Sequence, residues 1–254
     1  MILFVFEGAD REPYIYETIE RLYFPRDNDN IICSFGNNIY NLYKELMDYD
    51  GDGDIVAIMK DRLSANDDLS LNHIRRTEIS EIFLFFDYDF HHSQLSLEEI
   101  NKRIEEMLRM FDDETNNGKL YINYPMIESI RYTKELPDKN YYQYTVVRDD
   151  CRDFKKLAHE FSFYNGFDHI LFKKDEESIS KERYLTIKNN WMTLIEMNVC
   201  KANWLICNKY QLPSSKSDIN QLSIFLNQKS KYVDAENSVS VLNAFPIFIY
   251  DYMK

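Results

Sequence analysis

The sequence lacks the features that mark several large protein classes. Its four cysteines form no Cys-x-x-Cys pair, which argues against a disulfide framework or a cysteine zinc site. No apolar run is long enough to span a bilayer, and Met1 leads directly into a strand-like segment without a charged leader. We therefore expect a cytoplasmic protein with unpaired thiols, no membrane span and no secretory signal.

Basic residues are also scarce, with 30 Lys and Arg against 43 Asp and Glu and a net charge of −13. This imbalance argues against a general electrostatic grip on nucleic acid or on an acidic membrane. It leaves open a local basic groove, or a bound cation that inverts the local sign of charge. The sequence has no Gly-x-x-x-x-Gly-Lys-[Ser/Thr] loop, so any ATPase activity must come from another protein.

The composition is that of an ordinary globular protein, with 44% hydrophobic and 29% charged residues. A chain of 254 residues can bury a substantial core. It fits one large domain, or one domain with an appendage.

The most informative segment is the apolar run from Ile82 to Phe86, followed at once by Asp87-Tyr-Asp89. A continuous apolar run is typical of a strand in a parallel sheet that helices cover on both faces. In such sheets ligands bind at the carboxyl ends of the strands. Residues at i and i+2 of an extended chain point the same way, so Asp87 and Asp89 can converge there on a divalent cation. The alternative is a pair of solvated acids in a turn.

Two further strand-like segments precede acidic residues. Residues 2–6 lead into Glu7, and residues 120–123 are followed by Glu128, in the first turn of a helix that Pro125 opens. A surface Glu in a salt bridge is the alternative for Glu128. If the three strands are neighbours in a parallel sheet, the carboxylates gather along one edge. Oxygen-only ligands favour Mg²⁺ or Mn²⁺, whose natural chemistry here is phosphoryl transfer or phosphodiester hydrolysis.

The remaining elements follow from apolar periodicity and capping residues. Helices are expected over about 13–23, 39–47, 55–63, 97–111, 181–208 and 219–226. Ser96 and Ser217 are the expected N-caps of the fourth and sixth of these. Shorter strands are expected at 31–35 and 141–147, a turn at 112–118, and the apolar segment 239–253 is expected to dock on the core.

The segment Asp48–Asp54 imitates the start of a calcium-binding EF-hand loop, with acids at positions 1, 3 and 5 and Gly53 at position 6. The twelfth position, which needs a bidentate Glu, is Met59. We therefore interpret the segment as an acidic link between two helices.

The order Phe-Val-Phe-Glu7-Gly8 and, about eighty residues on, Leu-Phe-Phe-Asp87-Tyr-Asp89 resembles the Toprim motif. The acids that follow, at positions 10 and 12, look like the variant in OLD-family nucleases and in small Toprim-like proteins of bacterial phage defence. The segment Tyr124-Pro-Met-Ile-Glu128 also looks like part of those small proteins. The resemblance covers about the first 135 residues.

The resemblance implies an α/β fold in which residues 1–135 form a Toprim-like, Rossmann-like parallel sheet flanked by helices. Residues 136–254 would form a mainly helical region that serves as a lid, a homodimer surface or a partner dock. Glu7 would be a metal ligand or general base, and Asp87 and Asp89 would be ligands of Mg²⁺ or Mn²⁺. Glu12, rather than Asp10, would supply a second acid beside Glu7, and Glu128 a further ligand.

The function that the resemblance implies is that of a metal-dependent endonuclease acting on DNA or RNA. It would be an effector of phage defence by abortive infection, controlled by a separate AAA-type or ABC-type ATPase. One departure is the small number of basic residues in the first half, where we expect the candidates to lie on the solvated surface: Arg11, Lys60, Arg62, Arg75 and Arg76. His91 and His92 could contact phosphate or shuttle a proton, or simply form a surface turn.

Two other functions use the same residues. Phosphatases of the haloacid dehalogenase class carry Asp-x-Asp-x-[Thr/Val] after an apolar strand, with the first Asp as nucleophile. Here the fifth position is His91, the motif lies far from the N-terminus, and Glu7-Gly8 has no role. The other alternative is a degenerate Toprim-like module that binds a partner or senses a ligand.

Overall fold

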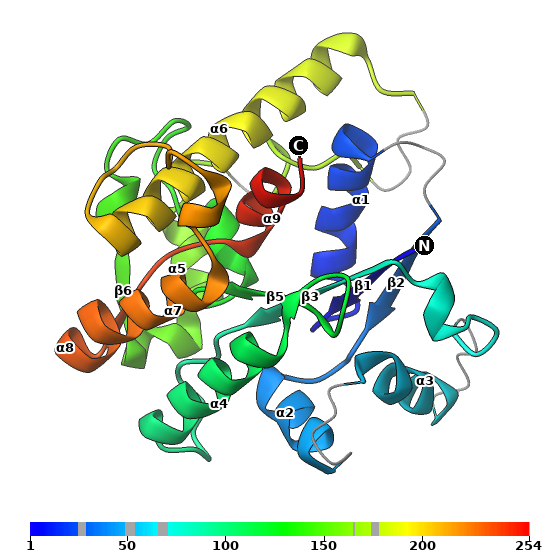
Figure 1. Cartoon of the computed structure of the whole chain (residues 1–254). Helices are drawn as coiled ribbons and strands as arrows, with labels where there is room; N and C mark the ends of the chain where they lie inside the picture. Colours follow the sequence, from blue (N-terminus) through cyan, green and yellow to red (C-terminus); the bar gives the residue numbers. More distant parts are fainter. Residues whose placement is uncertain (25–28, 49–53, 66–70, 165, 174–177, 254) are drawn as a thin grey trace.

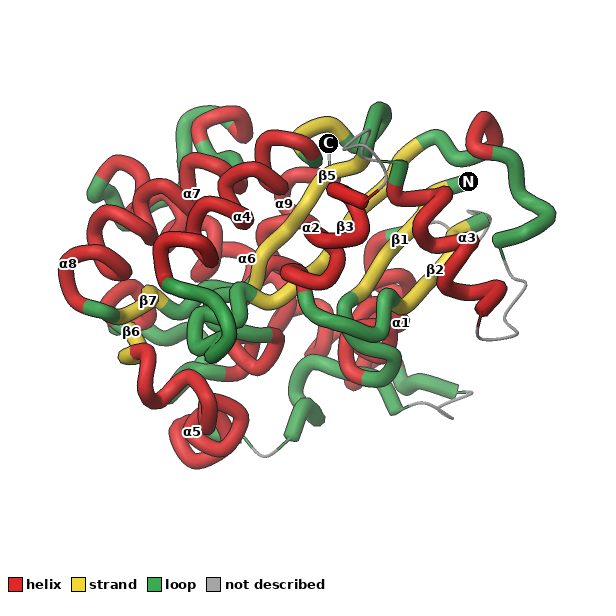
Figure 2. The backbone as a smooth tube through the Cα atoms, turned by 90° about the horizontal axis from the view of Figure 1, so that it is seen from below, coloured by secondary structure: helices red, strands yellow, loops and turns green. Residues whose placement is uncertain are grey.

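The computed structural model describes residues 1–24, 29–48, 54–65, 71–164, 166–173 and 178–253. Within these residues a five-stranded sheet has the order β2-β1-β3-β5-β4, and its first four strands run parallel. Figure 2 shows β2, β1, β3 and β5 side by side. Their bounds are β1 Ile2–Phe6, β2 Asn30–Ser34, β3 Glu81–Asp87, β4 Asp112–Asp113 and β5 Gly118–Asn123. The expected parallel sheet, with the run at Ile82 in its centre, is confirmed.

Helices connect the strands and cover both faces of the sheet, as an α/β fold requires. They are α1 Arg11–Tyr23, α2 Ile39–Asp48, α3 Ile55–Ala65, α4 Leu97–Met110 and the C-terminal α9 Ala244–Tyr252. Figure 1 shows α1 and α9 on one side of the sheet and α2, α3 and α4 on the other. The expected cap Ser96 is confirmed, because its hydroxyl accepts a hydrogen bond from the Glu99 N–H at the start of α4.

Aromatic side chains fill the layer between the sheet and α9. Phe85 of β3 stacks on Phe245 with ring centroids 4.6 Å apart, and Phe83 contacts Phe248 at 4.9 Å. Phe4 of β1 packs against Tyr16 of α1 at 4.2 Å. The last helix of the chain is thus part of the core of a sheet built from the first half, as expected for segment 239–253.

The second half of the described chain is largely helical. It comprises α5 Phe154–Phe161, α6 Lys181–Cys207, α7 Gln221–Gln228 and α8 Asp234–Glu236, with the antiparallel pair β6 Thr145–Val147 and β7 Ser238–Ser240. The long helix expected at 181–208 is confirmed as α6. Just beyond β7, Leu242 forms an antiparallel bridge with Tyr124, which follows β5.

Several local predictions were wrong. Asn220, rather than Ser217, caps α7, because Ser217 already belongs to a separate 3₁₀ turn. The helix expected after Pro125 is a short 3₁₀ helix, Ile127–Arg131, in a segment that the bridge at Tyr124 ties to Leu242.

Other differences concern element boundaries. The turn expected at 112–118 contains β4, which pairs with β5. The strand expected at 141–147 is β6 preceded by a 3₁₀ turn, and α1 begins two residues before Pro13. Of the segment Asp48–Asp54, residues 49–53 lie outside the described part of the chain.

No helix in the described ranges has the length and apolar character that crossing a membrane requires.

Candidate functional site

Five carboxyl groups gather at the carboxyl edge of the sheet, as the sequence predicts. Glu7 directly follows β1, Asp87 is the last residue of β3, and Asp89 lies two residues further on. Glu12 is the second residue of α1, and Glu128 lies in the 3₁₀ helix after β5. Strands β1, β3 and β5 are direct neighbours, and this adjacency brings together residues up to 121 positions apart in the sequence.

Glu7 and Asp87 form the centre of the cluster. The Glu7 Oε2 atom accepts a hydrogen bond of 3.0 Å from the backbone N–H of Asp87, so the ends of β1 and β3 are joined by a side chain. Asp87 is only 9% exposed. Burial raises the pKa of each of these two carboxyls well above its usual range. The proximity of the other acids raises both pKa values further, because like charges disfavour ionisation.

Glu12 lies against the backbone at Gly8. Its Oε1 atom accepts a hydrogen bond of 3.3 Å from the Gly8 N–H, and a Cβ atom at position 8 would lie 2.9 Å from Glu12 Oε2. The Glu-Gly pair therefore allows the carboxylate of Glu12 to approach the chain just after β1. Glu12 is 6% exposed whereas Asp10 is exposed, so the structure places Glu12, not Asp10, beside Glu7. Burial raises the pKa of Glu12, and Glu128 adds to the effect.

Asp89, two residues after β3, and Glu128, in the 3₁₀ helix after β5, complete the cluster. Asp89 has a φ of 44°, a left-handed conformation that turns the chain sharply after β3. Burial raises the pKa of Asp89, and the imidazoles of His91 and His92 act in the opposite direction. Glu128 is 6% exposed, and its Oε1 atom lies 4.0 Å from the Nζ of Lys155. The salt bridge of the alternative interpretation exists, but the carboxylate is buried.

Asn123 is a site residue that the sequence analysis missed. Its Nδ2 atom donates a hydrogen bond of 3.0 Å to Asp87 Oδ1, and the two residues are register partners at the ends of β5 and β3. A polar residue at the end of an otherwise apolar strand was the available signal. Tyr40 was also missed, and its buried hydroxyl donates a hydrogen bond to the Tyr88 carbonyl between the two acids of the Asp-x-Asp motif.

The carboxylate oxygens of the five acids are the ligands that a hard cation such as Mg²⁺ or Mn²⁺ prefers. A bound cation would also offset the repulsion between their negative charges. In the described conformation, oxygens of Glu7 and Glu12 accept hydrogen bonds from backbone N–H groups. Among the described residues, no three His, Cys, Asp or Glu side chains are arranged to hold a metal ion. The donor set therefore fits the ion chemically, and its side chains would have to turn to bind one.

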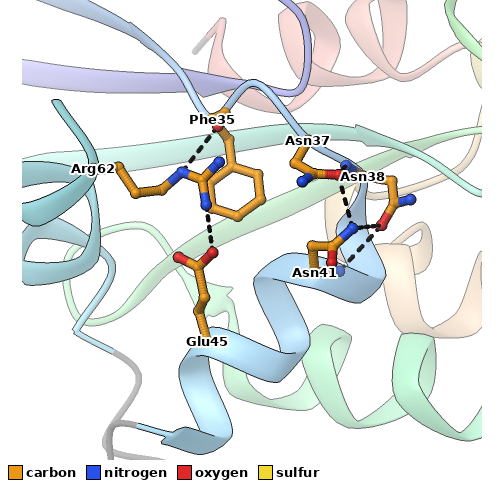
Figure 3. A network of polar contacts seen from close by, with 6 residues as sticks. All are labelled: Phe35, Asn37, Asn38, Asn41, Glu45 and Arg62. Carbon is orange, nitrogen blue, oxygen red and sulfur yellow. Dashed lines mark hydrogen bonds and ion pairs between the residues drawn. The ribbon is translucent and has the colours of Figure 1, made fainter. Parts of the chain in front are cut away.

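A polar network lies where the chain leaves β2 and enters α2 (Figure 3). The Asn41 amide donates hydrogen bonds to the side-chain oxygens of Asn37 and Asn38, at 2.7 and 2.9 Å, at the start of α2. Nearby, the Arg62 guanidinium donates to the Phe35 carbonyl at 3.1 Å and pairs with Glu45. Arg62, one of the basic candidates of the first half, is therefore engaged within the protein.

Basic side chains from the second half lie on the Asp89 flank. Arg148 and Arg152, in the 3₁₀ helix that follows β6, line a hollow of about 480 Å³ together with His91 and His92. The Arg148 Nε atom donates a hydrogen bond of 3.0 Å to the Phe90 carbonyl, which fixes this segment against the turn after β3. Sequence reasoning missed both arginines because their distance along the chain gave no sign of this contact.

No protein-family model matches the chain, and comparisons with curated proteins and with solved structures found no match either.

Proposed function

We propose that this protein is a Toprim-like, metal-dependent nuclease that hydrolyses phosphodiester bonds of DNA or RNA. The observation that supports the proposal is a cluster of five carboxyl groups at the carboxyl edge of a parallel sheet. Glu12, Asp87 and Glu128 are buried in it, and Glu7 and Asp89 are half-buried. Burying several carboxylates together is costly unless their charge is compensated. A divalent cation compensates it and also suits the cluster to a phosphate substrate.

Each residue has a role in the proposal. Asp87 and Asp89 hold Mg²⁺ or Mn²⁺, Glu12 and Glu128 supply further oxygens, and Asn123 orients Asp87 through its amide. Glu7, whose pKa is raised by burial and by the neighbouring acids, would act as a ligand or as the base that takes a proton from water. The bound metal would neutralise the developing charge on the phosphate and the leaving oxygen.

The test is a cleavage assay with Mg²⁺ or Mn²⁺ on plasmid DNA and on total RNA. Glu7→Gln and Asp87→Asn should each abolish cleavage. Asp112→Asn, which removes an exposed acid at the opposite edge of the sheet, should leave it unchanged. The proposal includes control by a separate ATPase within phage defence, so the assay is run with and without any ATPase encoded beside this gene.

A second function is favoured by the hydrogen bonds that Glu7 and Glu12 accept from backbone N–H groups, which occupy oxygens that a metal would need. In this case the chain would be a non-catalytic module that binds a partner. Absence of cleavage, together with no Mg²⁺-dependent shift of the melting temperature, would favour the module over the nuclease. A covalent aspartyl-phosphate at Asp87 would instead indicate a phosphatase of the haloacid dehalogenase class.

A further inference from the structure

The hollow beside Asp89 has the composition of an anion site in a strongly acidic protein. Its lining includes His91 and His92 from the turn after β3, and Arg148 and Arg152 from the 3₁₀ helix that follows β6. The only carboxylate among the described lining residues is that of Asp149. Two guanidinium groups and two imidazoles therefore face one acid, which reverses the overall charge balance of the chain.

The two arginines differ in how firmly they are held. Arg148 is fixed by its hydrogen bond to the Phe90 carbonyl and lies over the Phe90 ring, with its guanidinium carbon 5.7 Å from the centroid. Arg152 is exposed, and no hydrogen bond or ion pair to its side chain is found among the described residues. Its guanidinium donors, in the planar fork that suits phosphate oxygens, are available to a ligand.

The histidines carry unused hydrogen-bonding capacity. The Nδ1 atoms of His91 and His92 are buried and have no hydrogen-bond partner among the described residues. Buried polar atoms are usually paired, so these two nitrogens, on residues that line the hollow, are left for a ligand or an ordered water to satisfy. His91 also lies within electrostatic reach of Asp89, Arg148 and Arg152, so the hollow adjoins the acidic cluster.

We propose that this hollow binds a phosphate of the nucleic-acid strand, next to the phosphate that is cleaved at the acidic cluster. The inference rests on the proposed nuclease function and assigns its backbone-binding site. It also explains how a chain with a charge of −13 could position a polyanion. The basic side chains that bind it come from the second half, where Arg148 contacts the turn after the Asp-x-Asp motif. Phosphate contacts of this kind fix the register of a strand without reading its sequence.

The test measures binding separately from cleavage. Fluorescence anisotropy with a labelled single-stranded DNA and the matching RNA is recorded in EDTA, using full-length Asp87→Asn protein as the parent. Adding Arg152→Ala should weaken binding about tenfold, because a hydrogen bond to a charged group is lost. It should also lower the slope of log K against log salt concentration by about 0.7 for the lost single-strand phosphate contact.

Two further variants make the result specific. Arg75→Ala removes an exposed arginine near the opposite edge of the sheet, where it pairs with Glu78, and should leave binding unchanged. Asp149→Asn removes the one acid of the hollow and should tighten binding to the same probes. Because Arg152 and Asp149 are exposed, melting curves should show that both variants fold like the parent.

The outcomes separate this inference from the nuclease proposal. If Arg152→Ala binds like Arg75→Ala, or if the parent binds neither probe at low salt, the phosphate site is refuted, whatever the cleavage assay gives. If binding depends on Arg152 and Asp149 as expected, the site is supported. Absence of cleavage by wild type would then count against the nuclease alone and leave a module that binds nucleic acid.

Discussion

At the carboxyl edge of the sheet, each carboxylate raises the pKa of its neighbours. Asp87 is surrounded by apolar strand residues and by three other acids, and its Oδ1 atom accepts a single amide hydrogen bond from Asn123. One neutral hydrogen bond does not compensate a buried negative charge. In the metal-free protein this residue therefore opposes folding when it is ionised, although it is central to the proposed activity.

Replacing Asp87 with Asn should stabilise the metal-free protein at pH 8. The amide has nearly the same shape, its oxygen can still accept from Asn123, and the repulsion from Glu7 disappears. We expect a gain on the order of 1 kcal/mol in the free energy of unfolding, measured with urea in EDTA. The gain should vanish at pH 4, where the acid is protonated, and a loss of stability at both pH values would contradict the argument.

The raised pKa values also predict how stability depends on pH. Between the ordinary pKa of a carboxyl group and its raised value in the fold, the folded state binds more protons than the unfolded state. The free energy of unfolding therefore falls as pH rises through this window, by about 1.4 kcal/mol per pH unit for each group. For Glu7 and Asp87, the stabilisation is full below the unfolded pKa and is lost as pH rises through the folded one.

Glu7→Gln isolates the contribution of Glu7. The free energy of unfolding of wild type minus that of the variant should decline from pH 5 to pH 8 in EDTA, because only wild type has a titrating carboxyl at position 7. Saturating Mg²⁺ should reverse the trend in wild type, because the cation binds the ionised carboxylates. A difference that stays flat with pH would show that the Glu7 carboxyl is not perturbed by its surroundings.

Helix α9 shows how an element from the end of the chain completes a sheet made at its start. Its aromatic residues pack against Phe4 and Phe6 of β1 and Phe83 and Phe85 of β3. The strand register places these four side chains on one face of the sheet. Phe245 lies against Phe6 and Phe85, directly below the edge that carries Glu7 and Asp87. The packing of this helix therefore positions the strand ends from which the acids project.

Phe245→Ala should lower the free energy of unfolding by about 3–5 kcal/mol, the usual range for a buried phenylalanine. Phe245 is fully buried, and its loss would leave a cavity beneath β3. Phe163→Ala, at an exposed position, should change stability by less than about 0.5 kcal/mol. Urea unfolding followed by circular dichroism measures both, and equal effects would contradict the assigned role of α9.

The two halves of the molecule pack against each other at several places. One is the α9 layer, and another is the bridge between Tyr124 and Leu242, with backbone hydrogen bonds of 2.8 and 3.0 Å. Without them, the face of the sheet that carries Phe83 and Phe85 would be open to water. The motif-bearing residues 1–135 therefore depend on the rest of the chain for their core.

A fragment of residues 1–135 should not fold cooperatively by itself. Removing α9 exposes a contiguous aromatic surface, which favours aggregation over a native sheet. The measurement is urea unfolding of the fragment beside the full chain, followed by circular dichroism. A sigmoidal transition in the fragment, with stability close to that of the full chain, would show that residues 1–135 form an independent domain.

Much of the fold could be predicted because it depends on local patterns. The continuous apolar runs before Glu7 and Asp87 are buried when they form strands of a sheet that helices cover on both faces. The apolar spacing after Ser96 places the apolar side chains on one face of a helix. The failed predictions have different causes. The cap at Ser217 failed for a local reason, because this residue belongs to a separate 3₁₀ turn, whereas elsewhere a distant contact competes with the local signal. The segment after Pro125 is an example, since its bridge to Leu242 accompanies a short 3₁₀ helix in place of the expected one.

For the candidate site, the sequence by itself determined which acids end buried strands, and therefore that Glu7, Asp87 and Asp89 share one edge. Strand direction and periodicity are local properties, and parallel pairing places such ends together. Only the tertiary structure decided what surrounds these acids: the amide of Asn123, the backbone at Gly8 and the arginines at positions 148 and 152. These contacts depend on how the second half packs against the first, and residues distant in the chain carry no local pattern that reveals it.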